Sequence, residues 1–350
     1  MFDPKPLQHL LTQHARTFKA LSTIEQRLNA RLAYMQEPIR ALLLAVMAGE
    51  PLLLVGLPGT AKSRLIRNFC SMIGVQTDAA EYANDPDSQR RYFEYLLTPF
   101  TEPAELFGYF DVGAMQRGEG LQRLDDGMMH KADIVFLDEV FNGSSAILNA
   151  ILAFMNERVF HDRGRAVPVN MKCMFAATND IPRTGELKAV FDRFLIRAHL
   201  DNVAAEPEAL STLIEAGWSE TYADQGDADA FDWLLPALED LRGDIRRMTA
   251  TGKLKLQNNG QFYARLTDMV RNVRQYELSD MSNRRLIKLI HVMLLNRLYR
   301  ASLKGEGGKF TFGAPELLLI PRHALDIANR HDEADVLARL DLAARKFAEA

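Results

Sequence analysis

One short stretch contains the residue types needed to hold a phosphate. The segment GLPGTAKS, residues 56–63, almost fits the phosphate-binding loop G-x-x-x-x-G-K-[ST], with Ala61 in place of the second glycine. Such a loop turns backbone N–H groups toward the phosphate, presents a helix N-terminus, and adds a lysine charge and a hydroxyl for Mg²⁺. Lys62 and Ser63 supply the charge and the hydroxyl, and Ala61 is expected to favour the helix that follows. The alternative is an ordinary glycine-containing turn. The candidate nucleotide-binding residues are Gly56, Pro58, Gly59, Thr60, Ala61, Lys62 and Ser63.

Two adjacent carboxylates follow the apolar run IVFL in the segment IVFLDEV, residues 134–140. A nucleotide-hydrolysing site needs one carboxylate to hold Mg²⁺ and another to orient and deprotonate the attacking water. Asp138 suits the first role and Glu139 the second. The alternative is a pair of acids that cap the helix predicted after residue 142.

A third candidate is Asn179, at the end of the apolar segment MFAATND. A neutral amide at a strand end can bind the γ-phosphate or the water without adding charge. Taken alone, an Asn in this position is more often a turn residue.

A fourth candidate is Arg193, in the segment LKAVFDRFLIR. Hydrolysis of ATP builds charge on the transferred phosphoryl group, which an arginine from a neighbouring subunit can stabilise. The alternative is a helix-surface ion pair with Asp192 or Glu186, which is a common and weak interaction.

The elements that must position these residues follow an alternating pattern. Between Pro51 and about Leu200, short apolar runs alternate with helix-periodic segments, which predicts a parallel sheet flanked by helices. Helix-periodic segments dominate before residue 50 and after about residue 203. We therefore expect an α/β protein with a nucleotide-binding domain over 1–202, including N-terminal helices, and an all-α domain over 203–350.

Composition narrows the class of protein. The 350 residues are 47% hydrophobic and 25% charged, as in ordinary globular proteins. A net charge of −4 and a pI near 6.1 give no general attraction to nucleic acid or to anionic membranes. Cys70 and Cys173 favour a reducing compartment. The N-terminus lacks signal-peptide features and no apolar run reaches about 18 residues, which favours a cytoplasmic protein without a membrane partner.

Together these motifs resemble a known family. Five motifs along the chain are similar to those of AAA+ ATPases of the MoxR type: in order, GLPGTAKS, FLDEV, AATN, DRF and SNRR. The sequence that flanks these motifs is most similar to the RavA branch. The resemblance covers about residues 30–300. It implies a P-loop AAA+ core followed by an all-α lid, with alanine commonly preceding the lysine. RavA-type chains usually continue past the lid, so the biological task of that branch is not carried over.

The resemblance also implies roles for individual residues, with ATP and Mg²⁺ as cofactors. Lys62 contacts the β- and γ-phosphates, Ser63 and Asp138 hold Mg²⁺, and Glu139 is the base. Asn179 is then sensor 1, and Arg193 is the arginine finger acting in trans. In DMSNRRLIKL, Arg284 matches the sensor 2 arginine of the lid, in cis or in trans, and Arg285 is one residue out of register.

Two insertions resemble loops that face the pore of a ring. Residues 103–129 resemble the helix 2 insert, in which Gly108, Gly113, Gly118 and Gly120 would allow movement. Residues 157–174 resemble the pre-sensor 1 hairpin, turning at Asp162-Arg163-Gly164. The alternative for both is a passive surface loop. Trp218 and Trp233 are expected to be packing residues.

The leading hypothesis is an ATP-driven motor that remodels a partner protein. The family implies a homo-oligomeric ring, expected to be a hexamer, and a partner with a von Willebrand factor A (vWA) domain. One alternative is a ring-forming nucleic-acid motor related to minichromosome-maintenance helicases, which only the HDRGR stretch at residues 161–165 supports. The other is a small-molecule kinase, in which an arginine finger and a large lid would have no purpose.

Overall fold

The computed structural model describes residues 3–77, 91–162, 165–182, 185–203, 205–222, 230–256, 260–305, 310–327, 330 and 333–346. The chain divides into two compact units. The α/β unit comprises Pro51–Phe194 with Gly226–Ala230. The helical unit comprises Met1–Glu50, Leu195–Gln225 and Phe231–Ala350.

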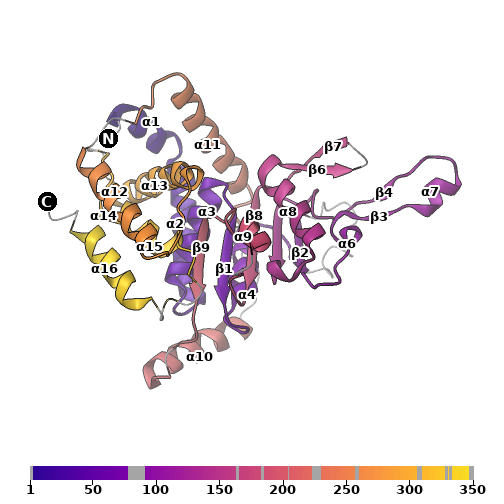
Figure 1. The fold of residues 1–350 in the computed structure, drawn as a ribbon, viewed down its shortest axis with the longest axis horizontal. Coiled ribbons are helices and arrows are strands. Elements are labelled where there is room, and N and C mark those ends of the chain that lie inside the picture. Colours follow the sequence, from indigo (N-terminus) through magenta and orange to yellow (C-terminus); the bar gives the residue numbers. More distant parts are fainter. Residues whose placement is uncertain are drawn as a thin grey trace. The chain divides into compact units, whose positions relative to one another are not determined.

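A five-stranded sheet has the order β2-β5-β8-β1-β9 (Figure 1). Strands β2, β5, β8 and β1 pair in parallel with their neighbours among these four. The sequence order thus switches around β1, which lies between β8 and β9. In open parallel sheets a ligand site forms at the carboxyl ends of the strands beside such a switch. The strands are β1 (Leu52–Gly56), β2 (Tyr92–Leu96), β5 (Ile134–Asp138), β8 (Cys173–Thr178) and β9 (Ile196–Leu200).

The apolar runs form these strands because strands of a parallel sheet are covered on both faces. The residues of β1 and β5 are buried except for the last one of each, and all six residues of β8 are buried. Helix α4 (Lys62–Met72) buries Leu65, Ile66 and Phe69, as their spacing predicts, and the Phe69 ring meets the Phe175 ring of β8 edge-on. The predicted fold class, a parallel sheet flanked by helices with further helices after it, is confirmed. The other helices of this unit include η1 (Val140–Asn142), α8 (Ser145–Glu157) and α9 (Gly185–Phe191).

The two predicted insertions leave the sheet as separate small elements (Figure 1). In the first, β3 (Tyr109–Phe110) and β4 (Arg123–Leu124) pair and carry α7 (Val112–Gln116) as an arm, after the short helix α6 (Pro103–Phe107). In the second, β6 (Val159–Asp162) pairs with β7 (Arg165–Pro168) as a hairpin, whose turn at 163–164 lies outside the described residues.

The base of the arm is fastened to the hairpin. Arg123 donates to Asp162 at 2.9 Å and to the carbonyl of Gly108 at 2.7 Å. The rings of Phe107 and Phe160 stack with centroids 4.2 Å apart. An ion pair and a ring stack therefore join the two insertions within the α/β unit.

The helical unit has a core of apolar helix faces. Its helices are α1 (Pro4–Gln13), α2 (Ala15–Arg31), α3 (Gln36–Ala48), α10 (Pro207–Tyr222), α11 (Leu234–Ala250), α12 (Gly260–Gln275), α13 (Asn283–Lys304), α14 (Ala314–Leu317), α15 (Leu319–His323) and α16 (Ala334–Arg345). Helices α1, α2 and α3 pack against α11 and α13. The N-terminal helices thus join the later helices rather than the nucleotide-loop region, which differs from the expected division at residue 202.

Helix α3 ends at Gly49, whose φ of 66° is the left-handed conformation expected of a glycine cap. Arg242 of α11 donates to the carbonyls of Val46 and Met47 in the last turn of α3. A Cβ at Gly49 would lie 3.3 Å from the Arg242 guanidinium. The left-handed backbone favours glycine here, and any larger side chain would also have to displace the Arg242 guanidinium by a few tenths of an ångström.

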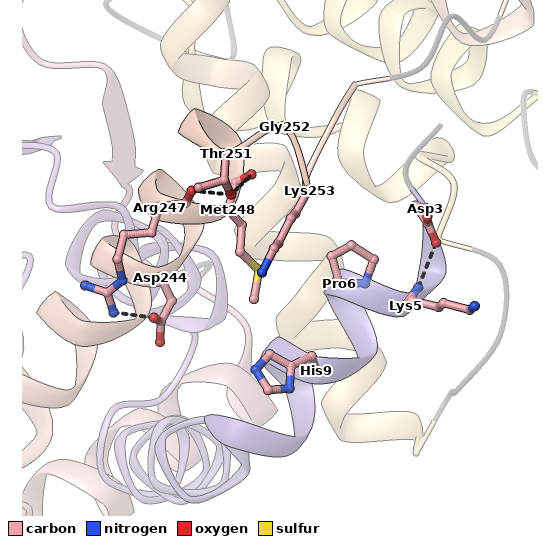
Figure 2. Close-up of a pocket in the computed structure, with 10 residues that line it drawn as sticks. All are labelled: Asp3, Lys5, Pro6, His9, Asp244, Arg247, Met248, Thr251, Gly252 and Lys253. Carbon is pink, nitrogen blue, oxygen red and sulfur yellow. Dashed lines mark hydrogen bonds and ion pairs between the residues drawn. The ribbon is translucent and has the colours of Figure 1, made fainter.

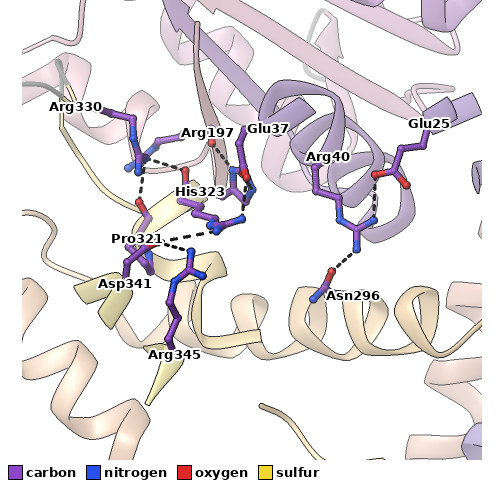
Figure 3. A network of polar contacts seen from close by, with 11 residues as sticks. Glu25, Glu37, Arg40, Arg197, Asn296, Pro321, His323, Arg330, Asp341 and Arg345 are labelled. Atoms are coloured by element: carbon purple, nitrogen blue, oxygen red, sulfur yellow. Dashed lines mark hydrogen bonds and ion pairs between the residues drawn. The ribbon is translucent and has the colours of Figure 1, made fainter. Parts of the chain in front are cut away.

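Polar groups inside the helical unit are extensively bonded to one another (Figure 3). Arg40 donates to Asn296 at 2.7 Å and Tyr299 donates to Glu25 at 2.5 Å. The carboxylate of Glu316, in a residue that is 0% exposed, accepts from Asn296 and Arg300. These contacts join residues far apart in sequence and fix the helix packing.

The expectation for the two tryptophans is wrong for Trp218. Trp218 of α10 is 66% exposed, so it is not a core residue. Trp233 is half-buried, and the Arg16 guanidinium carbon lies 4.0 Å from its ring centroid. Helix periodicity indicates which residues share a face but not whether another element covers that face. None of the described helices is long and apolar enough to cross a membrane.

Candidate nucleotide site

The loop between β1 and α4 turns through two left-handed residues. Gly59 has φ 84° and Ala61 has φ 63°, and Ala61 is the N-cap of α4. Thr60 tightens the turn, because its hydroxyl donates to the carbonyl of Leu57 at 2.8 Å. The expectation that Ala61 suits the loop by favouring helix is wrong, since it occupies the left-handed region that favours glycine, at a cost of about 1–2 kcal/mol.

The ammonium of Lys62 turns back under this loop. Its Nζ donates to the carbonyl oxygens of Gly56 at 2.6 Å and Leu57 at 3.1 Å, and to Oδ1 of Asn179 at 2.8 Å. Burial lowers the pKa of Lys62, while the charges of Asp138 and Glu139 act to raise it. The lysine is only 7% exposed, so its ammonium group lies inside the loop rather than in solvent.

The two carboxylates at the end of β5 occupy different backbone conformations. Asp138 is the last residue of the strand, and its Oδ1 accepts from the backbone N–H of Glu139 at 2.9 Å. Glu139 has φ 49°, a left-handed conformation that is costly for a residue with a side chain. Asp138 thus ends the strand, whereas Glu139 begins a left-handed turn that no sequence pattern predicts.

Asn179 connects the lysine to Glu139. Its Nδ2 donates to Oε1 of Glu139, while its Oδ1 accepts from Lys62. β8 lies between β1 and β5 in the sheet, so the end of β8 brings Asn179 between the two. The structure therefore brings Lys62, Asp138, Glu139 and Asn179 together from three strand ends, as their positions in the sequence predict.

The environment shifts the pKa of Glu139 upward. Burial is the largest cause, followed by the charge of Asp138, and the bonds to Asn179 and the charge of Lys62 oppose the shift. A carboxylate with a raised pKa is a better proton acceptor at neutral pH than an ordinary one.

The donor set fits a nucleoside triphosphate with Mg²⁺. Ser63 is half-buried at the second position of α4, and Asp138 is half-buried at the neighbouring strand end. Among the described residues, no cluster of three or more His, Cys, Asp or Glu could enclose a metal ion. Mg²⁺ bound with a nucleotide requires only one or two protein ligands, because phosphate and water complete its octahedron.

Arg193 lies two residues after α9. Its backbone N–H donates to the carbonyl of Val190 at 3.0 Å. Its Nε is buried and has no hydrogen-bond partner among the residues that the structure describes. The alternative ion pair with Glu186 lies outside the described side chains.

The two lid arginines are in different environments. Arg284 is exposed on the first turn of α13, as a ligand-contacting arginine requires. Arg285 is 3% exposed and donates to Ser279, Ala324 and Asp326. The partner Asp326 lies 41 positions from Arg285, and no local motif in the sequence marks this pairing.

A pocket of ≈ 740 Å³ lies elsewhere, within the helical unit (Figure 2). It is formed by the start of α1 and the end of α11, and is lined by Lys5, Lys253 and Arg247 together with Asp3 and Asp244. Arg247 is already bound to Asp244. The pocket contains none of the predicted site residues.

Comparison with known families identifies the chain. Residues 19–232 match the family described as the MoxR domain in the MoxR-vWA-beta-propeller ternary systems. The match covers more than half of the chain, and the chain belongs to this family. It is thus a MoxR-type AAA+ protein.

Three relatives are similar to part of this chain, and the similar region is only part of each relative. An uncharacterised protein of Methanocaldococcus jannaschii is 34% identical over 243 residues, which are 69% of this chain and 60% of that protein. A second one from the same organism is 36% identical over 177 residues, 51% of this chain and 43% of that protein. A structural protein of Acidianus two-tailed virus is 33% identical over 162 residues, 46% of this chain and 24% of that protein. The chain thus matches less than two thirds of the length of each of these relatives.

A solved structure supports the fold. A protein of Cytophaga hutchinsonii, proposed to be an ATPase, superimposes with a TM-score of 0.62 at 15% identity, covering 95% of both chains. At this identity the likeness concerns the fold alone.

Proposed function

We propose that the chain binds and hydrolyses ATP with Mg²⁺ and uses that energy to remodel a partner protein. The observation that carries this proposal is the set of bonds from Lys62 through Asn179 to Glu139, beside Asp138 and at the ends of three neighbouring strands. Hydrolysis requires a cation, a metal ligand and a base in this arrangement.

Each residue then has a role suited to its surroundings. Lys62 exchanges the carbonyl oxygens of Gly56 and Leu57 for phosphate oxygens, which are stronger acceptors for an ammonium. Ser63 and Asp138 hold Mg²⁺, which supplies electrostatic stabilisation of the transferred phosphoryl group. Glu139 accepts the proton of the attacking water, and Asn179 orients Glu139 and that water.

The arm supports action on another protein. Six of its apolar side chains are at least 38% exposed, whereas globular proteins usually bury such groups. They are Tyr109, Phe110, Val112, Met115, Leu121 and Leu124. The family description places such domains with vWA proteins, so we propose a vWA-domain partner. The finer resemblance to the RavA branch stays a prediction.

We propose a homo-oligomeric ring in which Arg193 completes the site of a neighbouring subunit. The position of Arg193 in the DRF segment, which resembles that of AAA+ arginine fingers, supports this role. Hexameric size follows from the family resemblance alone.

Mixing two inactive variants tests this arrangement. Arg193→Ala subunits keep Glu139, and Glu139→Gln subunits keep Arg193, so some interfaces of a mixed ring contain every catalytic group. ATPase activity should recover on mixing, and recovery should require protein concentrations at which subunits assemble. Full activity of Arg193→Ala alone, or no recovery despite measured subunit exchange, would exclude Arg193 as a trans finger.

The nucleic-acid alternative gains no support from the described residues. The central residues of HDRGR, Arg163 and Gly164, lie outside them, and the chain is acidic overall. Binding to DNA that weakens steeply with salt would favour that alternative.

A further inference from the structure

Helix α10 exposes the apolar face of its own helical pattern. Four large apolar residues recur at the spacing of one helix face and are 39% to 66% exposed: Leu210, Leu213, Ile214 and Trp218. Among the side chains of α10 that the structure describes, only that of Ala209 is buried. Helices in proteins are stabilised mainly by the packing of such a face, and an exposed apolar patch marks an interaction surface. Helix α10 therefore presents a surface for a partner.

The segment that contains α10 is strongly acidic. Residues 198–241 contain eleven of the 46 acidic residues and none of the 42 lysines and arginines. The rest of the chain therefore has 35 acidic residues against 42 basic ones. Glu215 is exposed on α10 and lies three residues before Trp218, on the same side of the helix. Charge complementarity favours a partner surface with positive groups around an apolar centre, and a second copy of this chain has that excess of positive charge.

The pocket between the start of α1 and the end of α11 has these properties. Its volume is ≈ 740 Å³, and Met248 and Lys253 extend from the end of α11 toward Pro6 and His9 of α1 (Figure 2). Thioether sulfur and ammonium groups are both favourable neighbours of an indole ring. The pocket therefore suits a tryptophan side chain with a carboxylate beside it.

The two carboxylates that line the pocket are bonded within this chain. Oδ1 of Asp3 accepts from the backbone N–H of Lys5 at 3.0 Å, and Asp244 is paired with Arg247. The side chains of Lys5 and Lys253 are exposed, and neither forms an ion pair with a residue that the structure describes. The pocket thus keeps positive charge for an incoming carboxylate.

The exposed face of α10 and this pocket lie at opposite ends of the helical unit, so they can meet only between copies (Figure 1). A contact between two different surfaces is heterologous. It repeats head to tail and gives a ring where the rotation between successive copies closes. A helix that seats apolar anchors in a complementary groove is a common mode of recognition.

We propose that the apolar face of α10 in one copy of this chain docks in the α1–α11 pocket of a second copy, with Trp218 inside the pocket and Glu215 beside Lys253. This contact goes beyond the proposed function, because it joins helical units and requires neither ATP nor Arg193.

Sedimentation velocity of the full chain without nucleotide tests this contact. The native chain should associate as its concentration rises, and added salt should weaken association because charged groups take part. Trp218→Ala should weaken association by roughly 30-fold or more, as truncation of a central aromatic residue does. Leu342→Ala is the control, since Leu342 is 54% exposed on α16, and it should not change association. A monomeric native chain, or unchanged association of Trp218→Ala, would overturn the proposal.

Exchange of charges tests the pocket as the receiving surface. Glu215→Lys and Lys253→Glu should each weaken association, because like charges then meet. Both substitutions in one chain should restore it, since every contact again pairs opposite charges. Glu215→Lys combined with Lys131→Glu is the matched control, because Lys131 belongs to the α/β unit, and it should not restore association. Restoration by both combinations, or by neither, would overturn the pocket as the receiving surface.

Unfolding and ATP hydrolysis separate the remaining outcomes. At a dilution where the chain is monomeric, Trp218→Ala should keep the native free energy of unfolding. A loss as large as that for a buried tryptophan would show that α10 is covered within its own chain and would overturn the proposal. ATP hydrolysis by a native chain that lacks this association would overturn the proposal alone, whereas absence of hydrolysis by a chain that associates in this way would overturn only the proposed function.

Discussion

In the α/β unit, the ammonium of Lys62 is bound by two backbone carbonyls and an amide oxygen, whereas in the helical unit the carboxylate of Glu316 is bound by an N–H, an amide and a guanidinium. The acceptors of Lys62 are neutral, so a phosphate can displace them with a gain in electrostatic energy. The partners of Glu316 include the opposite charge of Arg300, so the contacts of this carboxylate are already charge-assisted.

The backbone conformation also differs between the surroundings of Lys62 and those of Glu316. The loop that holds Lys62 and the strand end that holds Glu139 contain left-handed Ala61 and Glu139, which store strain. Residues around Glu316 lie in regular helix, with Gly313 as an extended N-cap. Lys62 and Glu316 are buried to a similar degree, 7% and 0% exposed, but only the contacts of Lys62 can be exchanged for stronger ones with a phosphate. Substitutions at Lys62 and Glu139 should therefore mainly change ATP binding and hydrolysis, whereas substitution of Glu316 should mainly change the free energy of unfolding.

The largest effect is expected from Glu316→Ala. Removing this carboxylate leaves the buried Asn296 and the guanidinium of Arg300, which is 26% exposed, without their partner. The free energy of unfolding should fall by about 3 kcal/mol, the lower end of the range for a buried pair, because water reaches Arg300 in part. Chemical denaturation measures this loss. ATP affinity of the folded fraction should not change, and a large change in affinity at unaltered stability would contradict the architectural role.

Glu139→Gln should lower the rate of ATP hydrolysis by roughly 10²-fold or more, the scale of general-base catalysis, while ATP still binds. Steady-state turnover and nucleotide titration measure the two quantities. Glu94→Gln is the control, since Glu94 lies on β2 and pairs with Arg67. Near-normal turnover of Glu139→Gln would place the base elsewhere.

The same variant should also change the pH dependence of stability. Burial, and after it the charge of Asp138, raises the pKa of Glu139 in the folded protein. In the unfolded chain, Glu139 loses its proton near the ordinary glutamate pKa of about 4.3. Just above this pH the folded protein therefore still holds a proton that the unfolded chain has lost. Stability is therefore lost as pH rises through this window, and Glu139→Gln avoids that loss. The variant should be more stable than the native chain at neutral pH, and the difference should shrink toward pH 4.

Lys62→Ala should weaken ATP binding by roughly 10- to 100-fold, since a charge-assisted contact contributes about 1.5–3 kcal/mol. The fold should survive, because the loop carbonyls that Lys62 leaves can bind water. Lys131→Ala removes an exposed lysine paired with Asp125 and serves as the control. Unchanged ATP affinity of Lys62→Ala would remove Lys62 from the site.

Trp233→Ala should lower the free energy of unfolding by about 1–2 kcal/mol, through loss of the contact with Arg16 and of half-buried ring area. The cost of about 3–5 kcal/mol for a fully buried tryptophan does not apply. Trp218→Ala, at an exposed position, should stay within about 0.5 kcal/mol of the native chain. Equal losses in thermal unfolding would contradict this ranking.

The smallest effect is expected from Ala61→Gly. Glycine relieves the left-handed strain of about 1–2 kcal/mol but adds entropy to the unfolded chain, about 0.4–1 kcal/mol. The net result should be a gain in stability of about 0–1.6 kcal/mol. A clear loss of stability would show that Ala61 makes packing contacts that outweigh its strain.

The strands and the motifs at their ends can be predicted from the sequence. The apolar runs before Gly56, before Asp138 and before Asn179 predicted three parallel strands, because strands buried on both faces must be apolar throughout. Parallel strands present their carboxyl ends at one edge, so the convergence of Lys62, Glu139 and Asn179 followed from the order of the motifs.

Features that depend on residues distant in sequence cannot be predicted from local patterns. The left-handed turn at Ala61, the exposure of Trp218 and the burial of Arg285 rather than Arg284 depend on which elements pack nearby. Arg284 and Arg285 are adjacent and chemically identical, and Asp326, 41 residues away, anchors Arg285. The burial of a side chain and the choice of its polar partner depend on contacts with residues distant in sequence. A motif of a few residues carries no information about those contacts.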